Sequence, residues 1–164
     1  MQMTEDEKWM KLALNLAHEA ADADEIPVGA VLVRNGEVIV EARNRCEELH
    51  DATAHAERLA ISMGGAATGS WRLSDCTLYV TMEPCPMCMG SVINARLGRV
   101  VYGAKDPRAG ACESLIRMGE YPLEATPECV GGVLEDESHA LLRAFFEKRR
   151  KETAKKRSQL FTNH

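Results

Sequence analysis

The sequence lacks the features that would place it in a membrane or outside the cell. No apolar run approaches the roughly 20 residues of a membrane-spanning helix. The N-terminus mixes Glu, Asp and Lys with apolar residues, which is not the pattern of a signal peptide. Six cysteines in 164 residues do not indicate a secreted disulfide scaffold. We therefore expect a protein of the reducing cytoplasm.

Common nucleotide-binding and hydrolase motifs are also missing. The sequence has no P-loop, no G-x-G-x-x-G and no G-x-S-x-G pattern. It has no internal repeat, low-complexity segment or linker, so we expect a single domain over residues 1–164. The net charge of −5 does not favour a nucleic-acid binder, but residues 148–157 read KRRKETAKKR. This basic end, about 148–164, is interpreted as a solvated helix end, a phosphate-contacting edge, or both.

The sequence does contain a set of residue types that bind metals. His55, Cys85 and Cys88 are three good zinc ligands. A structural zinc normally takes four protein ligands, whereas a catalytic zinc takes three and leaves a position for water. Glu57 is a carboxylate beside this set that is not needed within it, and an activated water beside a free carboxylate is suited to hydrolysis.

The spacing predicts how these residues meet. Cys85 and Cys88 are three positions apart and share a helix face. Pro86 suits the first position of a helix, so both thiolates should lie at a helix N-terminus, where negative charge is favoured. His55 and Glu57 can converge on one site only if His55 lies at the start of its own helix.

Other interpretations of the two cysteines remain open. A Cys-x-x-Cys after a strand and at the start of a helix also describes a thiol redox motif. A purely structural zinc would need a fourth ligand, for which His50 is the nearest candidate. The combined pattern His-x-Glu with Pro-Cys-x-x-Cys is the known signature of zinc nucleobase deaminases, and it favours catalysis.

Apolar periodicity predicts strands that alternate with helices. Strands are expected over 26–33, 37–42, 76–81, 99–103 and 128–130, with an Asn35-Gly36 hairpin turn between the first two. Helices are expected after a capping box at 4–7, from His55 to Gly64-Gly65, over 86–95, around 114–118, and from Glu135 to about Lys156 with Phe145 and Phe146 facing inward. This order predicts an α/β protein whose mixed sheet has parallel strands in its later part and helices on both faces.

These motifs resemble those of the cytidine/deoxycytidylate deaminase superfamily and, within it, the bacterial tRNA-specific adenosine deaminases. Residues 27–30, 51–57 and 78–88 carry the likeness to the superfamily. Residues 99–106 and the Phe145-Phe146 tail carry the likeness to the tRNA enzymes. The resemblance implies a three-layer α/β/α cytidine-deaminase-like fold with a mixed five-stranded sheet.

The resemblance also implies an activity, namely zinc-dependent hydrolytic deamination of adenosine to inosine at the wobble position of a tRNA anticodon. It makes His55, Cys85 and Cys88 the ligands of one zinc ion per subunit and Glu57 the catalytic proton shuttle. It further implies a homodimer that binds an anticodon stem-loop. The substrate-binding positions that it assigns are Asn44, Val28, Ala56, Asp106, Phe145 and Arg149.

Three rival functions are weighed against this one. A deaminase of a free base or nucleoside, of the guanine or cytosine type, would need no polynucleotide and no basic tail. A non-catalytic zinc adaptor that binds RNA would have no use for the free carboxylate of Glu57. A thiol oxidoreductase using Cys85 and Cys88 would show reversible oxidation and no stoichiometric metal.

Overall fold

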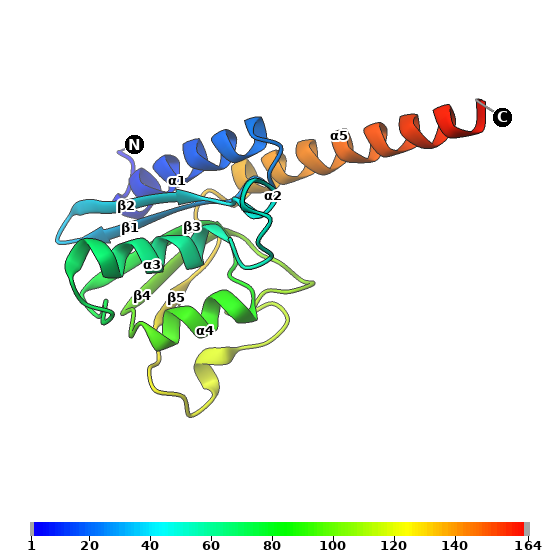
Figure 1. Ribbon diagram of the computed structural model, residues 1–164. Helices are drawn as coiled ribbons and strands as arrows, with labels where there is room; N and C mark the ends of the chain where they lie inside the picture. The colour runs from blue at the N-terminus through cyan, green and yellow to red at the C-terminus, as the bar shows by residue number, and fades with distance from the viewer. Residues whose placement is uncertain (1, 163–164) are drawn as a thin grey trace.

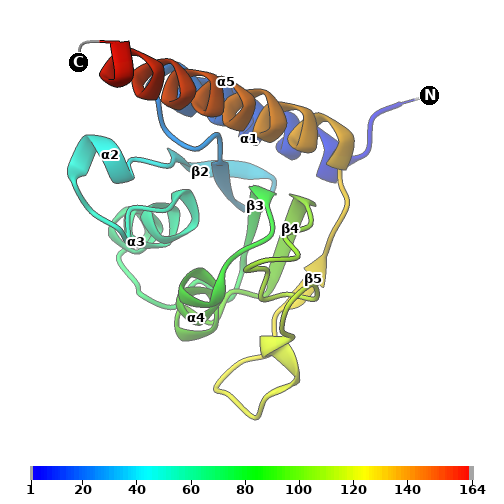
Figure 2. The same cartoon turned by 90° about the vertical axis from the view of Figure 1, so that its right-hand side faces the viewer.

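The computed structural model describes residues 2–162 as three layers, with a mixed sheet between two pairs of helices (Figures 1 and 2). The strand order is β2-β1-β3-β4-β5. β1 pairs antiparallel with β2 and β3, and β3, β4 and β5 are parallel. Helices α1 and α5 cover one face of the sheet, and α3 and α4 cover the other. The predicted fold class is confirmed.

The strands are β1 (Gly29–Arg34), β2 (Glu37–Arg43), β3 (Cys76–Met82), β4 (Arg99–Ala104) and β5 (Glu128–Val130). The helices are α1 (Glu5–Asp22), α2 (Cys46–Leu49), α3 (Ala56–Thr68), α4 (Pro86–Asn94) and α5 (Glu135–Thr162), with a 3-10 turn η1 (Met118–Glu120) before β5. Within residues 2–162, every helix is too short or too polar to span a lipid bilayer.

Two local signals act as the sequence predicts. Thr4 and Glu7 form a reciprocal capping box at the start of α1. Asn35 and Gly36 both have positive φ, 52° and 74°, as a two-residue hairpin turn requires. These signals fix where α1 begins and how β1 returns as β2.

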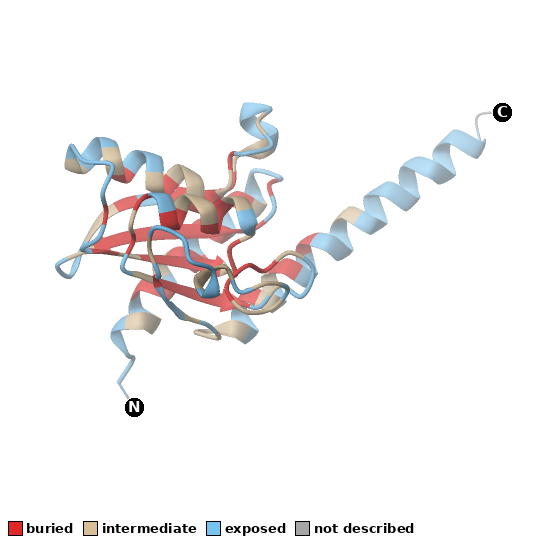
Figure 3. Cartoon of the chain, turned by 90° about the horizontal axis from the view of Figure 1, so that it is seen from below, coloured by how far each residue is buried: buried red, intermediate tan, exposed pale blue. Residues whose placement is uncertain are grey.

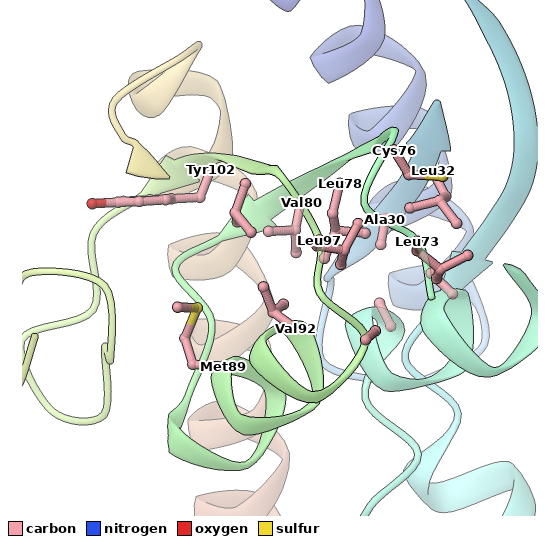
Figure 4. Packing of buried hydrophobic residues seen from close by; sticks show 14 of the residues in the cluster. Ala30, Leu32, Leu73, Cys76, Leu78, Val80, Met89, Val92, Leu97 and Tyr102 are labelled. Atoms are coloured by element: carbon pink, nitrogen blue, oxygen red, sulfur yellow. The ribbon is translucent and has the colours of Figure 1, made fainter. Parts of the chain in front are cut away.

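The core lies on both sides of the sheet because side chains alternate along each strand. On the side of α3 and α4, strand residues such as Leu32, Leu78 and Val80 pack with Met89 and Val92 of α4 (Figure 4). On the other side, a second apolar cluster joins α1 to the opposite faces of β1, β3 and β4. The side of α3 and α4 also carries the candidate site.

A polar group ties α1 to the sheet. Arg99 on β4 forms two hydrogen bonds with the Asp6 carboxylate, at 2.7 and 2.8 Å. The Tyr79 hydroxyl donates to the same carboxylate at 2.9 Å. These contacts hold the pKa of Asp6 below its ordinary value, with the Arg99 hydrogen bond as the main cause.

Two expected boundaries are wrong for reasons of backbone chemistry. The first strand begins at Gly29 rather than Ile26, because Pro27 has no N–H for a ladder. α3 does not stop at Gly64-Gly65 but continues to Thr68 and ends at Gly69, which has the left-handed conformation typical of helix ends. Gly64 allows α3 to pack closely against β1, because a Cβ at this position would overlap the Leu32 side chain.

Three further differences lie outside the sheet. No α-helix forms over 114–118, where the chain makes turns and enters η1 at Met118, and the short helix α2 in the segment before His55 was not predicted. α5 runs past Lys156 to Thr162 because its last part is rich in strong helix formers. Phe145 is buried, but Phe146 is 38% exposed, since adjacent helix residues point in different directions.

Candidate metal centre and its surroundings

His55, Cys85 and Cys88 converge on one point, as their spacing predicts. Their ligand atoms all lie within 4.8 Å of one another. Nδ1 of His55 is 3.6 Å from Sγ of Cys85 and 3.5 Å from Sγ of Cys88. A tetrahedral zinc with ordinary bond lengths would place such a nitrogen and sulfur about 3.6 Å apart. The geometry of the three side chains therefore fits a zinc ion.

Two helix N-termini bring these residues together. His55 is the N-cap of α3 and Cys85 is the N-cap of α4, both with extended backbone. Pro86 follows at the first position of α4, and Cys88 lies in its first turn. The predicted placement of His55 and Pro86 at helix starts is confirmed, and the free N–H groups there favour thiolate and carboxylate charge.

The protonation of the three groups is coupled. A hydrogen bond from the Cys88 thiol lowers the pKa of Cys85 to about 4, with help from His55. The same bond, together with burial, raises the pKa of Cys88. The Cys85 sulfur in turn raises the pKa of His55. The group thus already stabilises one thiolate, and a cation at its centre would favour the second.

Glu57 is the nearby carboxylate, at the second position of α3 and only 4% exposed. Burial raises its pKa, while its own backbone N–H, His55 and the Cys88 thiol act in the opposite direction. Few polar partners therefore engage this carboxylate, and burial favours its protonated form. These are the properties of a group that can take and return a proton.

A fourth protein ligand does not appear among residues 2–162. Among the His, Cys, Asp and Glu side chains of this part of the chain, His55, Cys85 and Cys88 form the group that could hold a metal ion. His50 caps α2 and is exposed, outside that group. Three ligands leave one position open, which is the pattern of catalytic rather than structural zinc.

Three of the predicted substrate-binding residues lie together beside α3. The Asn44 N–H donates to the Val28 carbonyl at 3.1 Å, and the Asn44 side-chain oxygen accepts from the Ala56 N–H at 2.8 Å. All three residues are buried. The Asn44 side-chain NH2 makes no hydrogen bond within residues 2–162, so it remains available as a donor.

Asp106 lies in the loop after β4, and the residue that holds this loop was missed by sequence reasoning. Glu83, directly before Pro84-Cys85, is 3% exposed and accepts hydrogen bonds from the backbone of Asp106 and of residues 112–114. Burial tends to raise the pKa of Glu83, but these donors and the Ser114 hydroxyl bring it below its ordinary value. The only signal for Glu83 in the sequence was its position directly before Pro84-Cys85.

Phe145 and Arg149 are on α5, at the point where this helix leaves the body. The Arg149 guanidinium lies 4.7 Å from the Phe145 ring centroid and donates to the Asp24 carbonyl at 3.0 Å. Phe145 is 7% exposed, so only a small part of its ring is open to a ligand. Asp24 precedes the segment that leads to Val28, which links α5 to the group formed by Val28, Asn44 and Ala56.

The last part of α5 forms a basic arm, defined here as residues 148–162. From residue 150 onward every described position is exposed (Figure 3). In Figure 1 the arm projects beyond the body on the side where α3 and α4 begin, at the ends of the strands. Within the described residues, none of its Lys and Arg side chains takes part in an ion pair. Residues 163–164 of the predicted basic end lie outside the described residues.

A hollow on the outer faces of α3 and α4 is separate from the three metal-binding side chains. Arg58, Ile61, Trp71 and Asn94 are among the residues that line it. Trp71 is 56% exposed, with the guanidinium groups of Arg72 and Arg96 at 4.1 and 5.6 Å from its ring centroid. This surface contains none of the predicted site residues.

Comparisons with known proteins agree on the family. Residues 3–104 match the cytidine and deoxycytidylate deaminase zinc-binding region. The chain is 45% identical over 159 residues to the tRNA-specific adenosine deaminase of Bacillus subtilis, which covers 96% of this chain and 99% of that protein. The matched zinc-binding region and the His/Cys/Cys group together make zinc the cofactor.

Solved structures give the same result. A structure from work on A-to-I editing by tRNA:A34 deaminases is 46% identical, with a TM-score of 0.80 over 82% of this chain and 99% of that one. The guanine deaminase of Nitrosomonas europaea is 27% identical, with a TM-score of 0.73 over 88% and 86%. The chain therefore belongs to the cytidine and deoxycytidylate deaminase family, and within it to the tRNA-specific adenosine deaminases.

Proposed function

We propose that this protein converts adenosine to inosine by zinc-dependent hydrolysis at the wobble position of a tRNA anticodon. The observation that carries this proposal is a three-ligand metal centre beside a buried, largely unpartnered carboxylate, in a chain that is 45% identical to a tRNA-specific adenosine deaminase over nearly its whole length. Such a substrate implies a cytoplasmic protein.

His55, Cys85 and Cys88 are the proposed ligands, and Glu57 is the proposed acid and base. Zinc held by the three ligands supplies a Lewis acid that makes water more acidic at neutral pH. Glu57 accepts a proton from the attacking water and donates it to the adenine ring nitrogen. It then takes the remaining proton from the hydroxyl newly bonded to C6 and delivers it to the amino group, which leaves as ammonia. The burial that raises the pKa of Glu57 supports this role, because a proton carrier works best when its pKa is near the working pH.

Asn44, Val28 and Ala56 form the proposed base pocket. The free NH2 of the Asn44 side chain can donate to an edge of the base, and Val28 can contact its face. Ala56 is fully buried and contributes through its N–H, which orients the Asn44 side chain. A base stacked in a helix cannot reach such a buried group, so the target nucleotide has to be splayed out of its loop. A wobble nucleotide in an anticodon loop meets that requirement.

The proposed RNA partner is an anticodon stem-loop that contacts Asp106, Arg149 and the basic arm. The arm holds seven basic and one acidic residue over 148–157, in a chain whose net charge is −5. Thirteen residues of helix beyond Arg149 extend about 20 Å, which is long enough to follow the phosphates of several nucleotides. This charge asymmetry supports a local RNA-binding surface rather than general attraction to nucleic acid.

We also propose a homodimer, in line with the family resemblance. The hollow over α3 and α4, with its exposed Trp71, is the surface that supports a second copy. Sedimentation velocity of the zinc-loaded protein should give the mass of two chains, and a monomer at micromolar concentration would contradict this assembly.

The experiment that tests the function is a deamination assay on an anticodon stem-loop with adenosine at the wobble position. Free adenosine, cytidine and guanine are assayed beside it, and a stem-loop with cytidine at the wobble position is the matched control. We expect inosine in the adenosine stem-loop alone, with an affinity that weakens steeply as salt rises. Turnover of a free base with the stem-loop untouched would move the protein to the rival function, which the similarity to a guanine deaminase supports.

A further inference from the structure

The Glu83 carboxylate is the hydrogen-bonding centre of the loop between β4 and η1. One oxygen accepts from the backbone N–H groups of Cys112, Glu113 and Ser114 at 3.1, 3.0 and 3.0 Å. The other oxygen accepts from the Asp106 N–H at 3.2 Å and from the Ser114 hydroxyl. Five donors therefore converge on one side chain from both ends of this loop.

The same loop is attached to the backbone around Glu83. The Glu83 N–H donates to the Ala104 carbonyl, and the Ala111 N–H donates to the Pro84 carbonyl, both at 2.8 Å. Gly110 lies against the carboxylate, because a Cβ at that position would overlap the Glu83 carboxylate and the Asp106 carbonyl. The loop thus closes around a side chain that is two residues before Cys85.

The charge of Glu83 is satisfied without a cation. No ion pair within residues 2–162 involves this carboxylate. Converging N–H groups of successive residues form an anion-binding concavity, and here the anion is a side chain of the protein itself. A glutamine could accept on only one side, since its NH2 on the other side would face the Asp106 N–H, which is also a donor.

Part of this loop also packs in the core, since Ala111 and Cys112 are buried in the apolar cluster on the side of α3 and α4. The part that carries Asp106 is more open, because Lys105, Pro107 and Arg108 are exposed and residues 105–110 contain no helix or strand. The Asp106 N–H bond to Glu83 joins this open part to the buried one, so the open part can move when the Glu83 carboxylate changes.

We propose that Glu83 is a positioning residue that fixes the 105–116 loop, and with it Asp106, at the mouth of the deaminase site. This inference rests on the proposed function, in which Asp106 contacts the anticodon stem-loop. Glu83 touches neither substrate nor zinc ligand in this role. It holds a contact surface that binds the nucleotide equally in the ground state and the transition state, so its loss raises KM rather than lowering kcat.

The test compares Glu83→Gln with Glu113→Gln. Both variants neutralise a glutamate of this region, but the Glu113 side chain faces Lys105, at 3.3 Å, and the Tyr102 hydroxyl, while its backbone N–H stays on Glu83. For Glu83→Gln we expect KM for the stem-loop to rise about tenfold or more, with kcat within about threefold of the parent and one zinc per chain. Glu113→Gln should leave all three values unchanged.

Hydrogen exchange supplies a readout that needs no substrate. Glu83→Gln should speed amide exchange at Asp106 and at residues 112–114 by a larger factor than it speeds exchange in the strands. Gly110→Ala approaches the same contact from the loop side and should reproduce both the faster exchange and the higher KM. Faster exchange with unchanged KM would make Glu83 a stabilising contact only and overturn the proposal.

Two other outcomes separate this inference from the proposed function. Loss of zinc from Glu83→Gln would show that the residue acts through Cys85, and unchanged exchange would show that it does not hold the loop. Either result overturns the positioning role. A parent protein that ignores the stem-loop would contradict the proposed function instead, and KM for whatever base or nucleoside it does use would then decide whether Glu83 positions the loop.

Discussion

Two glutamates beside the metal centre are almost equally buried, at 4% for Glu57 and 3% for Glu83, yet their surroundings are opposite. Burial raises the pKa of Glu57, because few donors compensate for the loss of water. At Glu83 five donors offset the cost of burial, and the pKa falls below its ordinary value. Low solvent exposure alone therefore does not decide what a carboxylate does.

The difference shows how the fold assigns separate roles to one residue type. A carboxylate whose lone pairs are all engaged stays ionised and fixed, so it can hold a loop but cannot exchange protons. A carboxylate with lone pairs to spare is costly to keep charged, so it can take up a proton and release it again. Glu57 is suited to chemistry and Glu83 to support.

We expect the largest difference between the zinc centre and the loop around Glu83 when the metal is lost. Cys88→Ser deletes one thiolate from the zinc centre, so we expect zinc content well below one ion per chain and deamination reduced to background. The loop around Glu83 has no zinc ligand and should keep its slow amide exchange. Metal analysis and hydrogen exchange on the same preparation would check both halves of this expectation.

Cys129→Ser is the control for the cysteine substitution. Cys129 is exposed and lies outside the metal group, so its replacement should leave one zinc per chain and full activity. Full zinc occupancy in Cys88→Ser would contradict the proposed ligand set. Loss of protection in the Glu83 loop would show that the two regions are not independent.

The same substitution at the two glutamates should have effects of opposite kind. Glu57→Gln should lower kcat by about 10³-fold, because proton transfer by this residue is lost, while zinc remains bound and stability stays the same or increases. Glu83→Gln should lower the free energy of unfolding by about 2 kcal/mol, because buried donors lose a charged acceptor.

Urea denaturation of the zinc-loaded variants and steady-state kinetics measure the two effects separately. If Glu57→Gln retained its turnover, Glu57 would have no role as proton carrier. If Glu57→Gln were the variant that lost stability, the contrast between an unengaged and a fully engaged carboxylate would be wrong.

The sequence predicted the Glu57 region better than the Glu83 region, and the reason is local chemistry. His55, Glu57, Pro86 and the two cysteines are spaced so that helix geometry alone defines which of them can meet. Glu83 reaches donors 23 to 31 residues away. No periodicity or motif in the sequence encodes such a loop.

The fold shows the same contrast between features that local sequence predicts and features that depend on distant residues. The mixed sheet, the hairpin at Asn35-Gly36 and the capped start of α1 were predictable from alternation and turn residues. No α-helix forms around 114–118, because the N–H groups of Leu115 and Ile116 donate to the Gly110 carbonyl and that of Met118 to the Ala111 carbonyl, which is not the helical pattern. The course of α3 through Gly64 depends on its contact with Leu32, which is known only once β1 is in place.

Asp6 extends the comparison to a carboxylate that is only partly buried and is satisfied by a cation. Its pKa is lowered mainly by Arg99, so its contribution to stability is complete at neutral pH and is lost as pH falls below about 3.8, through the folded-state pKa. Water screens this pair, so Asp6→Asn should cost only about 1 kcal/mol at pH 7. Urea denaturation at pH 7 and pH 3 should show the difference from the parent shrinking at the lower pH, while Asp22→Asn, an exposed change on the same helix, should show no such trend. A cost that stayed constant with pH would mean that Asp6 acts through its shape and neutral hydrogen bonds rather than through its charge.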